Sequence, residues 1–182
     1  LIERMRTDIG IDTVLTGYGL TETCGTVSLS DARDPAEVVA RTCGKPIPGI
    51  DVRIADSEGN ILAPGEEGEV QVRGFNVMIG YFEDPKGTAE AIDGEGWLHT
   101  GDVGKFEEDG RLVITDRMKD MYISGGFNCY PAEIEKILQK HPQVALAAVI
   151  GVPDKRMGEV GKAFIIPVAG EQPDPAEIAA WA

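Results

Sequence analysis

Apolar and polar residues alternate along several short stretches in the middle of the chain. The clearest are Ile50–Ile54 and Glu69–Arg73, where every second residue is apolar, a period that is typical of β-strands. Two more runs, 103–108 and 111–115, flank Asp109-Gly110, a dipeptide that predicts a tight hairpin turn because it tolerates positive φ angles. Many short strands in succession suggest a barrel or a sandwich.

The pattern changes after Arg117, where helical periodicity replaces the alternation. Pro131 is expected to open a helix, because proline is favoured at the first helical position. Ile134, Ile137 and Leu138 follow at positions i, i+3 and i+4, which places them on one face of that helix. We therefore expect this face to pack against a core.

Two apolar runs follow the predicted helix, Ala145–Val152 and Ala163–Val168, with the turn-rich segment 153–161 between them. Near the end of the chain, Asp174 supplies a helix N-cap and Pro175 a favoured first residue. An average helix has about 11 residues, and few residues remain after this start. We expect the chain to end inside an element, and the region after Arg117 to form an α+β unit.

Net charge also changes along the chain. The chain has 182 residues and a net charge of −14. Residues 1–117 hold 11 basic and 23 acidic residues, a net charge of −12, whereas 118–182 carry only −2. Together with the change of pattern, this predicts a domain boundary near Met118–Asp120.

Composition excludes several classes of function. The acidic balance disfavours nucleic acid and anionic membrane surfaces as partners, because both bind basic surfaces. The longest apolar stretch, Val144–Val152, has nine residues against the roughly 20 that span a bilayer. The three cysteines are widely spaced and form no C-x-x-C, so we expect reduced thiols, no structural zinc site and a cytoplasmic location.

The segment Thr16–Thr23 combines two glycines, an aromatic ring, three hydroxyls and a carboxylate in eight residues. Glycines let a backbone approach a ligand closely, a tyrosine ring can stack on a base, and Glu22 is a hard ligand for Mg²⁺. This mixture suits a nucleotide. A plain polar turn is the alternative interpretation, and the segment alone does not decide between them.

Other nucleotide and hydrolase motifs are absent. Gly161-Lys162 and Gly44-Lys45 lack the flanking residues of a Walker phosphate loop. Gly17-Tyr18-Gly19 is not followed by the last glycine of a dinucleotide fingerprint, and the sequence contains no G-x-S-x-G. We therefore reject a Walker-type ATPase, a dinucleotide-binding fold and a serine hydrolase.

Three further segments are candidates for a site. In His99–Asp102 the aspartate can accept the two hydroxyls of a ribose, or it can be a turn residue bound to its own backbone. Arg117–Asp120 reads as a charged linker. The adjacent glycines of Ser124–Asn128 suit a backbone that slides against a ligand or another domain, although a solvated loop explains them equally well.

Taken in order, these motifs resemble the adenylate-forming superfamily. The resemblance covers nearly the whole chain, and five motifs in the same order make it far more specific than any one alone. It is closest to acyl-CoA ligases of the fatty-acid or steroid-side-chain type, on the basis of the stretch from Gly125 to Glu135. The motifs are Tyr18–Glu22, Gly65–Glu69 with Gly74, Gly80 and Tyr81, Gly96–Asp102, Asp116–Asp120, and Gly125–Asn128 with Pro131, Glu133 and Glu135.

The resemblance implies a two-step reaction with ATP, Mg²⁺ and coenzyme A. ATP and a small-molecule carboxylate give an acyl-adenylate and pyrophosphate, and the thiolate of coenzyme A then displaces AMP. The implied ATP and AMP contacts are Tyr18 along the adenine, the backbone at Gly19, Thr21 on a phosphate, Glu22 as the Mg²⁺ ligand, and Asp102 and Arg117 on the ribose. Thr21 and Glu22 are also the implied catalytic residues.

The same resemblance implies a moving C-terminal domain. Lys119 is the expected hinge residue, and Ser124, Gly125 and Gly126 are expected to line the path of the coenzyme A pantetheine. The implied fold class is α+β, with a strand-rich, distorted-barrel subdomain followed by a small, truncated α+β domain. The expected parts are 1–117, the end of the large AMP-binding domain; 118–120, the hinge; and 121–182, an incomplete C-terminal lid.

The family's phosphate loop and adenylation lysine are expected to lie outside this chain. We therefore expect a C-terminal fragment of a ligase that is inactive on its own. Two alternatives remain: an acyl-AMP ligase that passes its product to a carrier protein, and a non-catalytic interaction module. The sequence does not specify the acyl group or the oligomeric state.

Overall fold

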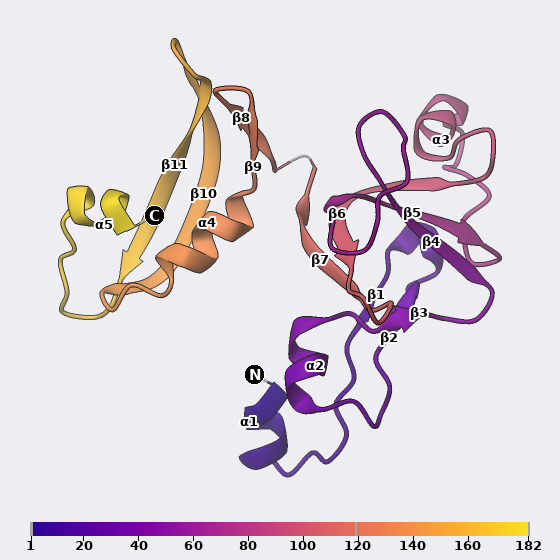
Figure 1. Ribbon diagram of the computed structural model, residues 1–182, viewed down its shortest axis with the longest axis horizontal. Helices are drawn as coiled ribbons and strands as arrows, with labels where there is room; N and C mark the ends of the chain where they lie inside the picture. The colour runs from indigo at the N-terminus through magenta and orange to yellow at the C-terminus, as the bar shows by residue number, and fades with distance from the viewer. Residues whose placement is uncertain (1, 119, 182) are drawn as a thin grey trace. The chain divides into compact units, whose positions relative to one another are not determined.

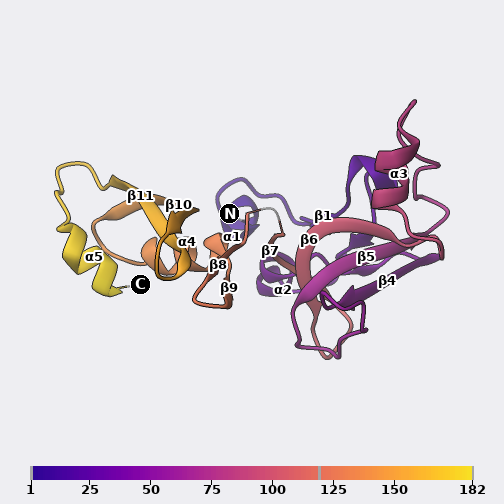
Figure 2. The same ribbon diagram turned by 90° about the horizontal axis from the view of Figure 1, so that it is seen from above.

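The structure, a computed structural model, describes residues 2–118 and 120–181. It divides into two compact units, Leu1–Ile114 and Thr115–Ala182 (Figure 1, Figure 2). The hinge predicted at 118–120 includes Lys119, which lies outside the described residues. Its role therefore stays a prediction. Within 2–118 and 120–181, no helix is both long and apolar enough to cross a membrane.

A four-stranded sheet dominates the first unit. In spatial order its strands are β4 (Ile50–Ala55), β5 (Gly68–Gly74), β6 (Leu98–Phe106) and β7 (Leu112–Arg117). The pairs β4–β5 and β5–β6 are antiparallel. The strands predicted from alternation are confirmed, because Ile54, Val70 and Val72 are buried on the face that meets Val27 and Leu112.

The hairpin predicted around Asp109-Gly110 is also confirmed. Strands β6 and β7 are neighbours in the sheet, and the Gly110 amide donates to the Glu107 carbonyl at 2.9 Å. Gly110 has a φ of +79°, whereas Asp109 stays at negative φ. Only the glycine of the pair therefore needs the left-handed region.

A second, three-stranded sheet brings together short segments from the start of the chain. Its antiparallel strands are β1 (Gly17–Tyr18), β2 (Ser28–Leu29) and β3 (Lys45–Pro46). The helices of this unit are α1 (Ile2–Thr7), the short 3₁₀ helix η1 (Thr21–Thr23), α2 (Ala36–Arg41) and α3 (Pro85–Ala91).

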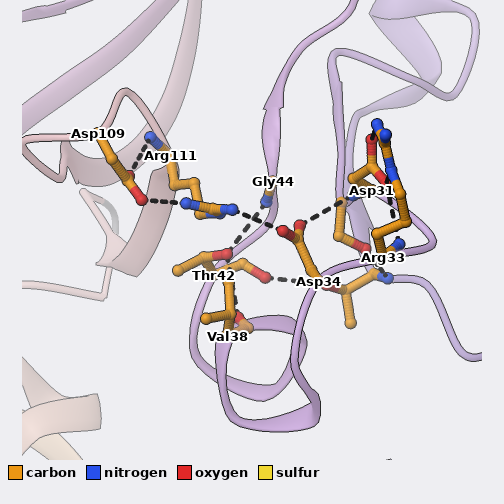
Figure 3. A network of polar contacts seen from close by, with 10 residues as sticks. Asp31, Arg33, Asp34, Val38, Thr42, Gly44, Asp109 and Arg111 are labelled. Atoms are coloured by element: carbon orange, nitrogen blue, oxygen red, sulfur yellow. Dashed lines mark hydrogen bonds and ion pairs between the residues drawn. The ribbon is translucent and has the colours of Figure 1, made fainter.

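Gly44, just before β3, allows the chain to pass directly against β2. Its φ is +75°, and a Cβ atom there would lie 2.0 Å from the backbone of Leu29. The Gly44 amide donates to Oγ1 of Thr42, whose hydroxyl donates to the Val38 carbonyl (Figure 3). No side chain other than hydrogen fits at this position.

Arg111 ties the hairpin to the loop before α2. Its guanidinium contacts Asp109 and lies 2.5 Å from Oδ1 of Asp34, as Figure 3 shows. The backbone amide of Asp31 and the Arg111 guanidinium lower the pKa of the Asp34 carboxyl. This network joins segments that are 77 residues apart.

The second unit is a sheet covered on one face by helices. Its spatial strand order is β10, β11, β8, β9, and all neighbouring strands are antiparallel. The helices α4 and α5 share a core with β8 and β10, formed by Tyr122, Leu138, Val144, Ala147, Val149 and Ile178. The elements are β8 (Tyr122–Ser124), β9 (Phe127–Cys129), α4 (Pro131–Leu138), β10 (Val144–Asp154), β11 (Gly158–Pro167) and α5 (Pro175–Trp181).

Most predicted elements of this unit are confirmed, with two differences. Helix α4 begins at Pro131, and the Asp174 side chain caps α5 by accepting the Ala176 amide at 2.8 Å. Ile137, however, is 39% exposed, so it does not share the buried face of Leu138. The segment 153–161 is mostly strand, because the β10–β11 hairpin pairs as far as Asp154 and Gly158.

Candidate functional site

The loop after β1 forms a closed turn that is held by its own atoms. The buried Thr23 hydroxyl accepts the Leu20 amide at 2.9 Å and donates to the Leu20 carbonyl at 3.0 Å. A Cβ atom at Gly19 would lie 2.4 Å from the Gly25 carbonyl oxygen, so the turn closes only with glycine there. Thr21 is exposed and Glu22 half-buried. The turn thus presents both predicted side chains on its outer surface.

A second segment, after β5, fastens this turn from outside. The buried Asn76 donates through Nδ2 to the carbonyls of Thr23 and Thr26, at 3.1 and 2.7 Å. The Met78 amide donates to the Glu22 carbonyl at 2.8 Å. Sequence analysis did not assign Asn76 to the site, because its partners lie 50 and 53 residues away along the chain.

The carboxylate of Glu22 has a hydroxyl partner. The Tyr81 hydroxyl donates to Oε1 of Glu22 at 2.9 Å, and this bond raises the pKa of Tyr81. Within residues 2–118 and 120–181, no three His, Cys, Asp or Glu side chains gather into a metal-binding group. A lone carboxylate fits Mg²⁺, which proteins often hold through one or two carboxylates together with substrate phosphates.

Asp102 lies in a bulge of β6. Glu69 of β5 faces Val103 and Gln71 faces His99, so three residues of β6, from Thr100 to Asp102, lie opposite Val70 alone. Gly101, in the middle of the bulge, has a φ of +70°, which glycine adopts without strain. Asp102 is only 7% exposed. The bulge therefore places a carboxylate where a regular strand would place it differently.

Tyr18 and Asp102 meet although 84 residues separate them. The Tyr18 hydroxyl donates to Oδ2 of Asp102 at 2.7 Å. Burial, and secondarily the hydrogen bond to Asp102, raise the pKa of Tyr18 well above its usual range. The structure thus joins two of the predicted nucleotide contacts. Whether the ring lies along an adenine and the carboxylate binds a ribose stays a prediction.

The remaining predicted residues belong to the second unit. Arg117 ends β7 and is exposed. Gly125 and Gly126 form the turn between β8 and β9, with φ values of +59° and +90°. Half-buried Ser124 precedes them, and the Gly125 amide donates to the Met157 carbonyl at 2.8 Å. The predicted coenzyme A path thus lies on a tight turn, and the roles of these residues stay predictions.

Sequence comparison gives two family matches in the expected order. The AMP-binding enzyme family matches residues 1–82, and the AMP-binding enzyme C-terminal domain matches residues 133–182. The two matches fall on either side of the division between the units.

Individual relatives agree with these matches. The (methyl-dioxo-octahydro-indenyl)propanoyl:CoA ligase of Mycobacterium tuberculosis is 51% identical over all of this chain and 34% of its own length. A fatty acid–[acyl-carrier-protein] ligase, ScoC of Streptomyces coeruleorubidus, is 44% identical over 88% of the chain and 31% of its own length. The chain thus spans about a third of the length of the curated relatives it matches.

Among solved structures, ATP-bound MatB from Rhodopseudomonas palustris superposes with a TM-score of 0.86. It is 36% identical and covers 92% of this chain, which matches 33% of MatB. Its similarity extends to the fold as well as to the sequence. The ordered motifs, the two family matches and this shared fold together show that the chain belongs to the adenylate-forming, AMP-binding enzymes.

Proposed function

We propose that this chain is part of a longer acyl-CoA ligase, the parent ligase, which activates a carboxylic acid with ATP and transfers the acyl group to coenzyme A. The observation that carries the proposal is the buried Asp102 carboxylate beside the Tyr18 ring, an acceptor for sugar hydroxyls next to a surface for a base. The relative that is a CoA ligase, at 51% identity, supports the choice of thiol. We also propose a cytoplasmic location.

The proposed adenylation step depends on positioning and on charge. The carboxylate substrate attacks the α-phosphorus of ATP, a P–O bond forms, and the bond to the pyrophosphate oxygen breaks. The Thr21 hydroxyl, on the outside of the closed turn, donates to a phosphate oxygen, and Glu22 holds Mg²⁺. Mg²⁺, when bound, neutralises charge on the phosphates. Asp102 and Arg117 hold the ribose while the phosphates react.

The proposed second step uses groups of the second unit. The sulfur of coenzyme A attacks the acyl carbon of the adenylate, and AMP leaves with the electron pair of the broken C–O bond. Ser124, Gly125 and Gly126 line the pantetheine path, and Lys119 is the hinge about which this unit turns between the steps. Tyr18 and Asp102 keep the nucleotide in place through both steps.

ATP–pyrophosphate exchange by the parent ligase tests the proposal. We expect exchange that depends on a carboxylic acid, and thioester formation that depends on coenzyme A. A panel of fatty acids and ring-bearing propanoates identifies the acyl group. Absence of carboxylate-dependent exchange, together with absence of AMP binding, would favour a non-catalytic interaction module.

A second candidate function is transfer of the acyl group to a carrier protein. One observation favours it, namely the 44% identity to a relative that acylates an acyl-carrier protein. The two functions differ in the acceptor. If the parent ligase makes acyl-adenylate but releases no AMP with coenzyme A, and does so with a phosphopantetheinylated carrier protein, the carrier function holds.

Replacing Asp102 by alanine in the parent ligase is expected to impair both steps. Hydrogen bonds to a charged group contribute about 1.5–3 kcal/mol each, so kcat/KM for ATP should fall about tenfold to a hundredfold. Pyrophosphate exchange and single-turnover thioester formation measure the two steps separately. Asp56→Ala, in an exposed turn, is the matched control and should change neither. A loss below about twofold would sink the ribose assignment.

Replacing Tyr81 by phenylalanine is expected to weaken the use of Mg²⁺. The variant loses the donor to Oε1 of Glu22, and a hydrogen bond of this kind contributes about 0.5–1.5 kcal/mol. The Mg²⁺ concentration for half-maximal exchange should therefore rise about two- to tenfold. In a Glu22→Gln background the same substitution should add nothing further. An equal effect in both backgrounds would separate Tyr81 from Glu22.

A further inference from the structure

The bulge that carries Asp102 interrupts the regular pairing of β5 and β6. Extra residues in one strand leave backbone groups without ladder partners, and buried groups of this kind must find other partners. The groups affected here are the Val70 carbonyl and the amides of Gly101 and Asp102. Each of the three has a side-chain partner, from Thr100 or Glu69.

Thr100 satisfies two of these groups within the bulge. Its hydroxyl donates to the Val70 carbonyl at 2.7 Å and accepts the Asp102 amide at 3.1 Å. The hydroxyl thus links the core strand β5 directly to the backbone of Asp102. A single oxygen replaces the missing rung of the ladder.

Glu69 satisfies the third group from the opposite strand. Its Oε1 accepts the Gly101 amide at 3.3 Å, and its Oε2 accepts Nδ1 of His99 at 2.7 Å. The two oxygens therefore hold one residue inside the bulge and one residue at its edge. The Glu69 side chain is only 14% exposed, so water competes weakly for these bonds.

Neighbouring side chains hold Glu69 in turn. Nε2 of the buried Gln71 donates to Oε2 of Glu69 at 3.0 Å, and Oε1 of Gln71 accepts Nε of Arg53 at 2.7 Å. The Arg53 guanidinium lies over the Trp97 ring, 4.1 Å from its centroid. Glu69 is thus fixed on the side away from the bulge as well as on the side toward it.

From this geometry we infer that Glu69 is a positioning residue for Asp102. It does not touch the nucleotide. It holds His99 and Gly101 so that the bulge keeps Asp102 at the Tyr18 hydroxyl and at the ribose. The second part rests on the proposed function, whereas the first part concerns only the Asp102–Tyr18 contact.

Three variants of the parent ligase test this inference. Glu69→Ala removes both acceptors. Glu69→Gln keeps an oxygen for the Gly101 amide, and its NH₂ can donate to neutral His99 in the other tautomer. Glu67→Gln is the matched control, because Glu67 precedes the same strand but bonds Lys105, at 2.7 Å, outside the bulge.

The first measurement compares ATP with 3′-deoxy-ATP, which lacks one ribose hydroxyl. The ratio of their kcat/KM values reports the ribose contact, and a general loss of folded enzyme lowers both values equally. We expect Glu69→Ala to reduce this ratio about three- to tenfold, with Glu69→Gln and Glu67→Gln within about twofold of the wild type. In an Asp102→Ala background Glu69→Ala should change the ratio no further, because the contact is already lost.

The second measurement does not depend on any ligase activity. The ¹³Cζ chemical shift of Tyr18 at neutral pH, assigned with Tyr18→Phe, reports its hydroxyl bond to Asp102 without nucleotide. We expect Glu69→Ala to move this signal toward that of a solvated phenol and Glu67→Gln to leave it in place. If Glu69→Ala leaves the signal and the ratio unchanged, the positioning role is overturned. If only the ratio stays unchanged while the wild type shows no preference for ATP, the proposed function fails instead.

Discussion

Replacing Gly44 by alanine is expected to prevent stable folding of the first unit. The new Cβ atom would lie 2.0 Å from the backbone of Leu29, and the residue would keep a φ of +75°. The contact is with backbone, which no side-chain rotation relieves, so β2 and β3 must separate. We expect a loss of about 4 kcal/mol or more in the free energy of unfolding, at the extreme of single substitutions.

The matched control is Gly59→Ala. Gly59 has a φ of +86°, but nothing lies within 4 Å of a Cβ atom there. Its cost is therefore the backbone strain alone, about 1 kcal/mol. Urea titration followed by circular dichroism compares the two variants with the wild type. Equal losses for Gly44→Ala and Gly59→Ala would contradict the close approach of Gly44 to Leu29.

Residues 1–182 alone are expected to form acyl-adenylate at less than about a hundredth of the rate of the parent ligase. The chain spans about a third of its curated relatives, and the family's phosphate loop and adenylation lysine are predicted to lie outside it. Removing one group that stabilises charge in a transition state can cost about a hundredfold or more. Glu22 and Thr21 alone supply too few such groups.

ATP–pyrophosphate exchange with a panel of carboxylic acids measures this difference. Binding of AMP, followed through the Tyr18 signal, is the control that the nucleotide contacts are folded in the shorter chain. Carboxylate-dependent exchange near the rate of the parent ligase would mean that the essential groups lie within residues 1–182, and that the motif placement is wrong.

Local patterns predicted the regular elements well. The alternation in Ile50–Ile54 and Glu69–Arg73 predicted strands because one face of this sheet is buried. Asp174 predicted the start of α5 because its side chain caps the backbone two residues later. Ile137 was placed wrongly, since helical spacing gives the direction of a face but not how far the core extends around the helix.

The site was predictable only as separate motifs. Tyr18 and Asp102 could be named from the sequence, but their hydrogen bond depends on the pairing of β5 with β6 and on the bulge opposite Val70. Asn76 could not be found, because an amide that donates to two distant carbonyls leaves no periodic signal. The contacts that shape the site are set by tertiary structure rather than by local sequence.

The hydrogen bond between Tyr18 and Asp102 has a consequence for ligand exchange. Without nucleotide, a phenolic hydroxyl already occupies one oxygen of this buried carboxylate. If that oxygen accepts a ribose hydroxyl as proposed, the sugar replaces one O–H donor with another, and the count of hydrogen bonds hardly changes. Tyr18 would then act as a placeholder, which keeps the empty site from admitting competing cations and lets AMP depart without leaving a bare charge behind.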